Sequence, residues 1–181
     1  MAVHRGSVLT DTNTVIEAHR VGAWRALSSR YRLVTVAKCL EETQTGFQRR
    51  RPEENIDPTI LRPSFHSVEP DDALAIMRLQ LEGPGAHLDA GELSLWAHAL
   101  TREDDWLICG ADAASMRFGF SQGHRARLAS LGGLLNDIGF RPALPPRRNF
   151  GKPWLDDLIH RLAMEGLKQG PGQGPGQGRP A

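Results

Sequence analysis

Short apolar runs in this chain alternate with longer segments in which apolar residues recur every three or four positions. The short runs predict strands at residues 7–10, 32–37 and 106–110. The longer spacing predicts helices at residues 15–29 and 88–100. Because alternating strands and helices favour parallel strand pairing, we expect an α/β fold in which helices cover both faces of a mostly parallel sheet.

Weaker signals of the same kind complete the expected order of elements. They predict a helix opening at Cys39 and ending near Gly46, an edge strand at 65–68, a helix after Asp71 and Asp72, a helix at 113–118, a strand at 127–131, and helices at 134–139 and 154–166. We therefore expect one domain over residues 1–166. Prolines and charged residues predict a loop or insertion around 48–70. The Gly/Pro/Gln-rich residues 167–181 should be disordered, since they have almost no side chains to bury.

Composition narrows the choice of partners and compartment. The 22 Lys and Arg residues nearly balance the 21 Asp and Glu residues, so the net charge of +1 gives no overall attraction to nucleic acid or membrane. Cys39 and Cys109 lie in apolar surroundings without metal-ligand spacing, which predicts buried free thiols in a reducing compartment. The N-terminus has no apolar signal region and no run reaches a membrane span, so we expect a soluble cytoplasmic protein without a membrane partner.

Acidic residues follow the strongest predicted strands. Asp11 ends the first apolar run, and Asp112 follows the run at 106–110 after one intervening residue. The carboxyl ends of parallel strands meet at one edge, so both side chains should emerge there. Glu92 in the first turn of one helix and Glu41 or Glu42 in the first turns of another can reach the same edge. An N-cap role for Asp11 is the structural alternative.

Carboxylates that converge without matching cations repel one another strongly. A divalent cation is the usual resolution, because it replaces the missing positive charge. Ligands that are all oxygen select hard ions such as Mg²⁺ or Mn²⁺. The histidines are scattered without zinc-ligand spacing, and no phosphate-binding loop or nucleophile elbow is present.

The acidic segments resemble the PIN-domain family of metal-dependent ribonucleases. The resemblance lies in L-T-D-T-N at 9–13, E-E-T-Q-T-G at 41–46, D-A-G-E and its following helix at 89–99, and I-C-G-A-D-A-A-S at 108–115. It covers residues 7 to about 140, and the order and spacing of the motifs are more specific than any one of them. It implies a three-layer α/β/α fold, an acidic metal site and endonucleolytic cleavage of RNA.

The resemblance also implies a role for each acidic residue. Asp11 and Asp112 would hold one Mg²⁺ or Mn²⁺ directly, while Glu92 and Glu42 would bind a second ion or orient water. Glu42 matches the family when Gly46 is aligned with the family's glycine, and counting from Thr35 favours Glu41 instead. Asn13 matches a small polar residue that supports the first aspartate.

Cationic residues follow Asp112 closely and are candidates to contact the RNA backbone. They are Arg117, Arg125 and Arg127, with His124 beside them. Ordinary surface positions on a helix and loop are the structural alternative for each of them.

The sequence also supports other functions. Gly110-Ala111-Asp112 lacks the hydroxyl that many family members carry before the last aspartate, which favours a PIN-like module that binds RNA or protein without catalysis. Asp11-Thr12-Asn13-Thr14 superficially resembles the D-x-D-x-T pattern of haloacid-dehalogenase-like phosphatases, but Asn13 replaces the second aspartate. A toxin-like role with an antitoxin partner, and a homodimer, are expectations from family analogy alone.

Overall fold

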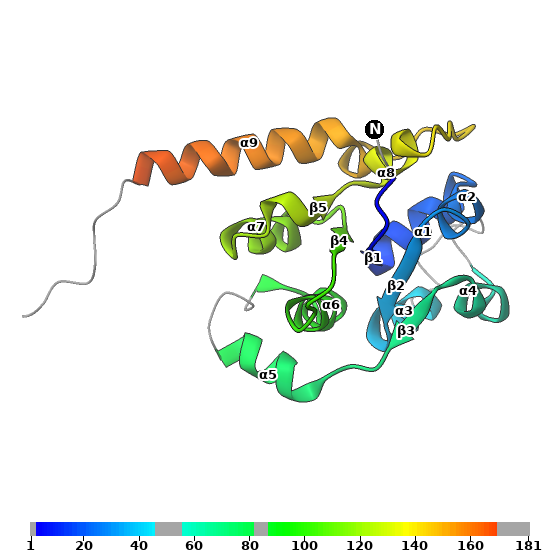
Figure 1. The fold of residues 1–181 in the computed structure, drawn as a ribbon, viewed down its shortest axis with the longest axis horizontal. Coiled ribbons are helices and arrows are strands. Elements are labelled where there is room, and N and C mark those ends of the chain that lie inside the picture. Colours follow the sequence, from blue (N-terminus) through cyan, green and yellow to red (C-terminus); the bar gives the residue numbers. More distant parts are fainter. Residues whose placement is uncertain (1–2, 46–55, 82–86, 170–181) are drawn as a thin grey trace, which may run out of the picture.

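The computed structural model describes residues 3–45, 56–81 and 87–169, and its centre is a parallel sheet (Figure 1). Its strands are β1 (Ser7–Thr10), β2 (Arg32–Val36), β3 (Ser67–Glu69), β4 (Trp106–Cys109) and β5 (Leu128–Ala129). All pairings among them are parallel, in the order β3-β2-β1-β4-β5. The predicted α/β class with a mostly parallel sheet is confirmed.

The strand order creates a switch point beside β1. From β1 the chain moves outward through β2 to β3, and it then returns to place β4 on the other side of β1. Val8 pairs with Leu33 of β2 and with Leu107 of β4. In open parallel sheets the crevice at such a point, beyond the carboxyl ends of the strands, is where ligands bind.

Helices surround this sheet, as the three-layer prediction requires. They are α1 (Thr12–Arg20), α2 (Trp24–Ser28), α3 (Ala37–Gln44), α4 (Pro58–Ser64), α5 (Ala73–Leu81), α6 (Ala90–Leu100), α7 (Ala113–Ser121), α8 (Leu131–Asp137) and α9 (Lys152–Gln169), with short 3₁₀ turns η4 (Arg125–Arg127) and η5 (Arg148–Phe150). In the part of the chain described here, no helix has the length and apolarity needed to cross a membrane.

Successive residues of each strand point to different hydrophobic cores. Val8 and Cys109 pack in a core formed with α1, α2, α4 and α8, whereas Leu9 and Ile108 pack in a second core with α3, α5 and α6. This alternation follows from the two-residue period of a strand and explains why β1 is buried along its whole length and β4 is apolar on both faces. Cys39 and Cys109 are buried free thiols, as predicted.

The single helix expected at 15–29 is wrong. α1 begins at Thr12 and ends at Arg20, and α2 starts only at Trp24. Gly22 between them has a φ of 69°, a left-handed conformation that glycine adopts without steric cost. The apolar spacing continues across this break, so periodicity alone did not reveal it.

The region expected to be an insertion contributes to the core in its second half. Asp57 caps α4 by accepting a hydrogen bond from the backbone N–H of Thr59 at 2.8 Å, and Pro58 occupies the first turn. Leu61 of this helix is fully buried. Residues 46–55, which include the first part of the expected loop, lie outside the described residues.

The C-terminal helix is longer than its apolar spacing indicated. Gly166 was expected to end it, but α9 continues to Gln169. The remaining residues of the predicted disordered tail, 170–181, lie outside the described part of the chain.

A buried carboxylate joins α1 to the segment before η5. Glu17 is fully buried and accepts hydrogen bonds from the Arg20 side chain at 2.7 and 2.8 Å. It also accepts one from the backbone N–H of Arg147 at 2.6 Å, and the Arg147 guanidinium lies 3.4 Å away. Burial would raise the pKa of Glu17, but these partners outweigh it and hold the pKa below its usual value. Glu17 therefore fixes the entry to η5.

We expect Glu17→Ala to lower the free energy of unfolding by about 3 kcal/mol, because it breaks a buried ion pair and leaves the Arg147 N–H without its acceptor. Urea unfolding monitored by circular dichroism measures this change. The matched control is Glu41→Ala, which removes an exposed pair with Lys38 and should cost less than about 0.5 kcal/mol. Equal losses in the two variants would contradict the structural role given to Glu17.

Candidate functional site

A cavity of about 280 Å³ lies at the carboxyl edge of the sheet, beside the switch point. Its lining comprises Asp11, Thr12, Asn13, Cys39, Glu42, Thr45, Asp89 and Glu92. The structure thus brings together three of the four predicted acidic site residues, and no lysine or arginine is among the described residues that line it. The cavity is therefore strongly acidic.

Asp11 uses its two carboxylate oxygens differently. It follows β1, and its Oδ1 accepts a hydrogen bond from the backbone N–H of Thr14 at 2.6 Å, so it does cap α1. Its Oδ2 is buried and has no hydrogen-bond partner among the described residues. The residue as a whole is only 5% exposed. Burial, with a contribution from the charge of Asp89, raises the pKa of Asp11 to about 6. A buried carboxylate oxygen without a donor is costly, and such a group commonly has a functional reason.

Glu92 is held at the start of α6 by reciprocal hydrogen bonds with Asp89. The Asp89 carboxylate accepts from the backbone N–H of Glu92 at 2.8 Å, and Glu92 Oε2 accepts from the backbone N–H of Asp89 at 3.3 Å. Burial, together with the charges of Asp89, Asp112 and Asp11, raises the pKa of Glu92 to about 8. These carboxylates are therefore close enough to destabilise one another's charged forms.

The structure distinguishes the two candidates on α3. Glu42 lines the cavity, and its Oε2 accepts a hydrogen bond from the Thr12 hydroxyl at 2.9 Å. Glu41 instead pairs with Lys38 at 3.2 Å, and its side chain is 62% exposed. Glu42 is thus the residue of this pair at the site. Asn13, the expected supporting residue, is exposed and also lines the cavity.

Asp112 lies beside the cavity, not in its lining. It caps α7, because its Oδ1 accepts hydrogen bonds from the backbone N–H groups of Ala114 at 2.6 Å and Ser115 at 3.1 Å. Its charge nevertheless contributes to the raised pKa of Glu92. Asp112 therefore contributes its charge to the acidic group, although it follows the neighbouring strand β4 and does not line the cavity.

These side chains do not already form a metal-ligand set. Among the residues described, no three His, Cys, Asp or Glu side chains are grouped so that they would hold an ion. Two of the oxygens already have donors, since Glu42 binds Thr12 and Glu92 binds the Asp89 N–H. Direct ligation by all four predicted residues would need side-chain rotation, whereas Asp11 Oδ2 has no bond to break.

Four residues of the cavity lining were not predicted from the sequence as site residues: Thr12, Cys39, Thr45 and Asp89. Asp89 and Thr12 line the cavity, and they hold Glu92 and Glu42 respectively. The signal for Asp89 was present, because Asp89 and Glu92 have the spacing of a capping box. Nothing in the sequence indicated that Thr12 would donate to a residue thirty positions away.

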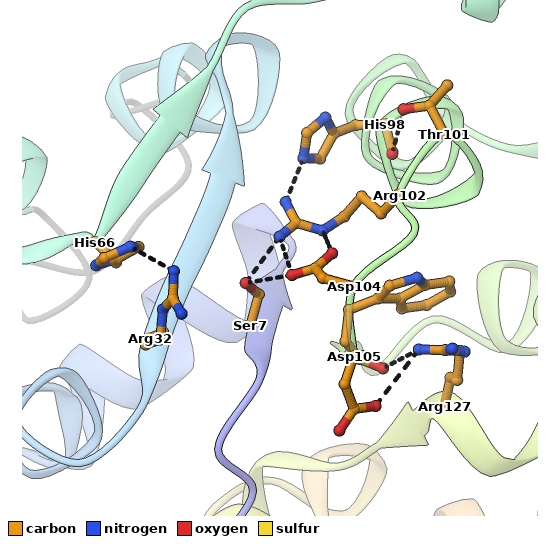
Figure 2. A network of polar contacts seen from close by, with 10 residues as sticks. Ser7, Arg32, His66, His98, Thr101, Arg102, Asp104, Asp105 and Arg127 are labelled. Atoms are coloured by element: carbon orange, nitrogen blue, oxygen red, sulfur yellow. Dashed lines mark hydrogen bonds and ion pairs between the residues drawn. The ribbon is translucent and has the colours of Figure 1, made fainter.

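The predicted RNA-binding arginines are not gathered at the acidic cavity. Arg127 lies over the Trp106 ring at 4.6 Å, donates to the Trp106 carbonyl at 3.0 Å and pairs with Asp105 at 3.7 Å (Figure 2). It therefore lies at the amino end of β4, whereas Asp112 follows the carboxyl end. Arg117 pairs with Glu165 on α9 at 3.7 Å, and Arg125 lines a different cavity against α9.

The histidine next to these arginines is also engaged within the fold. The His124 ring lies 5.5 Å from the Trp106 ring and 6.5 Å from the Trp96 ring. Burial and the nearby charge of Arg127 lower its pKa, so the ring is neutral near pH 7. His124 therefore supplies no positive charge toward the acidic cavity.

Comparison with known proteins gives no independent assignment. No model of a known protein family matches the chain, and no curated protein matches it significantly.

Proposed function

We propose that this protein is a Mg²⁺- or Mn²⁺-dependent ribonuclease of the PIN type, with its site at the acidic cavity. The buried and unpartnered Oδ2 of Asp11 is the observation that carries the proposal. Asp11 lines a cavity that holds further carboxylates, at the switch point of a parallel sheet. A divalent cation would supply the partner that Oδ2 lacks and offset the repulsion among the acidic groups.

The donor set fits a hard cation. Every predicted ligand offers carboxylate oxygen, the donor that Mg²⁺ and Mn²⁺ prefer. Asp11 and Asp112 would hold one ion, and Glu92 and Glu42 would bind a second ion or orient a water molecule. When bound, such a cation activates water and stabilises negative charge on a phosphodiester undergoing cleavage.

The chain's own residues prepare the site for this chemistry. Thr12 orients the Glu42 carboxylate, and Asp89 orients Glu92. Since the pKa of Asp11 is raised to about 6 and that of Glu92 to about 8, cation binding must displace protons near neutral pH. Metal affinity and activity should therefore increase as the pH rises from 6 to 8.

The first test is cleavage of a mixed RNA pool by the purified wild-type protein. We expect cleavage with Mn²⁺, loss of cleavage in EDTA, and recovery when excess Mn²⁺ is returned. Cleavage that persists in EDTA would overturn the metal-dependent mechanism. Absence of cleavage with Mg²⁺ and Mn²⁺ would favour the second candidate below.

The second candidate is a PIN-like module that binds RNA or protein without catalysis. The absence of a preformed ligand set among the described residues favours it, as does the lack of a hydroxyl in Gly110-Ala111-Asp112, where many members of the PIN family carry one. Calorimetric titration separates the two. A chain that binds RNA but shows no heat of binding with millimolar Mn²⁺ fits only the non-catalytic module.

The setting of this activity is proposed by analogy. A toxin-like nuclease with an antitoxin partner, a homodimer and a cytoplasmic location all accord with the PIN-type proposal. Size-exclusion chromatography with light scattering tests the homodimer directly: a mass of about twice the 19.9 kDa chain supports it, and the monomer mass contradicts it.

A further inference from the structure

A second cavity, of about 600 Å³, lies between η5 and α9 and differs in charge from the acidic one. It is lined by Arg148, Asn149, Trp154, Asp157, His160 and Arg161. Its lining therefore includes two arginines and a histidine but only one carboxylate. A cavity of this size is too large for a lone phosphate ion and suits a ligand of nucleotide size.

The position of this cavity is fixed relative to the end of β4. Asn149 donates a hydrogen bond from Nδ2 to the carbonyl of Ala111 at 3.2 Å, and Ala111 immediately precedes Asp112. Phe150 is buried in the hydrophobic core, and Glu17 holds the backbone of Arg147. The lining contributed by η5 is therefore anchored to Ala111, the residue next to the predicted metal ligand Asp112.

The cationic side chains of the cavity are exposed and not engaged within the described structure. Arg148 and Arg161 are both exposed, and none of the ion pairs among the described residues involves either of them. This distinguishes them from Arg117 and Arg127, which pair with Glu165 and Asp105. A guanidinium in this situation can bind a phosphate without first losing a protein partner.

Trp154 adds an aromatic surface to the cavity. The other tryptophans, Trp24, Trp96 and Trp106, are all buried, whereas Trp154 is partly exposed. It lies on α9 seven residues before Arg161, so both side chains are on one face of the helix. Arginines combined with an exposed aromatic ring are the usual means of binding single-stranded nucleic acid, in which the bases are free to stack.

We propose that the cavity between η5 and α9 is a binding subsite for single-stranded RNA, whose continuation reaches the acidic cavity past Asp112. Arg148 and Arg161 contact phosphates, and Trp154 stacks on a base. The choice of RNA as ligand rests on the proposed function, while the subsite itself rests on these residues. Asp157 also lines this cavity, one turn before Arg161 on α9, and its negative charge disfavours compact anions, so an extended strand with spaced charges fits better.

The test is binding of a fluorescently labelled eight-nucleotide oligouridine in EDTA, where cleavage does not interfere. We expect Arg148→Ala/Arg161→Ala to weaken binding at least about tenfold and to reduce the slope of log affinity against log salt by about 1.4, the value for two phosphate contacts on a single strand. The matched control is Arg78→Ala, an exposed arginine on α5 outside the cavity, which should leave both quantities unchanged. Equal affinities in the double variant and the control would overturn the subsite.

Tryptophan fluorescence provides a second readout, because Trp154 is the partly exposed tryptophan. We expect the oligonucleotide to quench wild-type emission, and Trp154→Phe to abolish the quenching while retaining most of the affinity, since phenylalanine still stacks. Unchanged quenching in this variant would contradict the stacking role.

The subsite and the nuclease can fail separately. Binding that depends on both arginines in a protein without cleavage would support the subsite and reject the nuclease. Metal-dependent cleavage in a protein whose RNA affinity is unchanged when both arginines are removed would support the nuclease and reject the subsite.

Discussion

Asp11→Asn is expected to lower metal-dependent RNA cleavage by about a thousandfold, because a bound cation contributes several kcal/mol and about 4 kcal/mol corresponds to that factor. The substitution removes the negative charge of a side chain that lines the cavity and replaces one of its two carboxylate oxygens with nitrogen. It preserves an oxygen that can accept the hydrogen bond from Thr14, so the start of α1 should be retained. Initial rates on a labelled RNA with saturating Mn²⁺ measure the effect.

The control for this prediction lies on α3. Glu41→Gln also removes one acidic charge, but its side chain pairs with Lys38 away from the cavity. We expect its cleavage rate to stay within about twofold of wild type, since exposed ion pairs contribute little. If Asp11→Asn retained wild-type cleavage, the acidic cavity would not be the active site.

The same buried carboxylates should contribute less to the stability of the metal-free protein at alkaline than at acidic pH. The pKa of Asp11 rises from 3.8 to about 6, and that of Glu92 from 4.5 to about 8, chiefly because burial disfavours the charged forms. Between pH 4 and pH 6 the folded state then holds a proton on Asp11 that the unfolded state has lost. The stability that Asp11 contributes is complete below pH 4 and is lost as the pH rises through 6. The contribution of Glu92 is lost as the pH rises through 8.

Asp11→Asn should therefore stabilise the metal-free protein at pH 8 although it lowers metal-dependent cleavage. The pKa rise of Asp11 corresponds to on the order of 3 kcal/mol, which the uncharged asparagine avoids. The gain should vanish at pH 4, where wild-type Asp11 is protonated. Urea unfolding in EDTA at both pH values measures the difference between the variant and the wild type.

Comparing the variant with the wild type removes opposing contributions from groups whose pKa is lowered on folding, such as Glu17 and His19. Burial lowers the pKa of His19 to about 4, so its contribution to stability is lost as the pH falls from 6.5 through 4. This trend is common to both proteins and cancels in the difference. A variant that is less stable than wild type at pH 8 would show that the Asp11 carboxylate is not disfavoured by burial.

The sequence was sufficient for the fold class because the relevant signals are local. Strand runs such as 106–110 are apolar on both faces, and that is the pattern of a central parallel strand. The break at Gly22 was missed because the apolar period continues across it. The α4 helix was missed because its prolines favoured a loop, although Pro58 in its first turn is compatible with a helix.

The sequence could predict only those residues of the acidic cavity whose positions follow from the ends of strands. Asp11 follows β1 and Asp112 follows β4, and adjacent parallel strands place them at one edge. Glu42 and Glu41 are adjacent in sequence, so only the packing of α3 against α1 and α6 decides which of them faces the cavity. The arginines of the second cavity come from η5 and α9, which no local pattern connects to Asp112.

X-ray diffraction from a crystal soaked in Mn²⁺, recorded for its anomalous signal, tests the central claim most directly. We predict an anomalous peak about 2.1 Å from Asp11 Oδ2, with Glu92 or Asp112 as a further ligand directly or through water. A peak bound elsewhere on the molecule, with Asp11 Oδ2 paired to a protein donor, would contradict the proposal that this cavity is a metal centre.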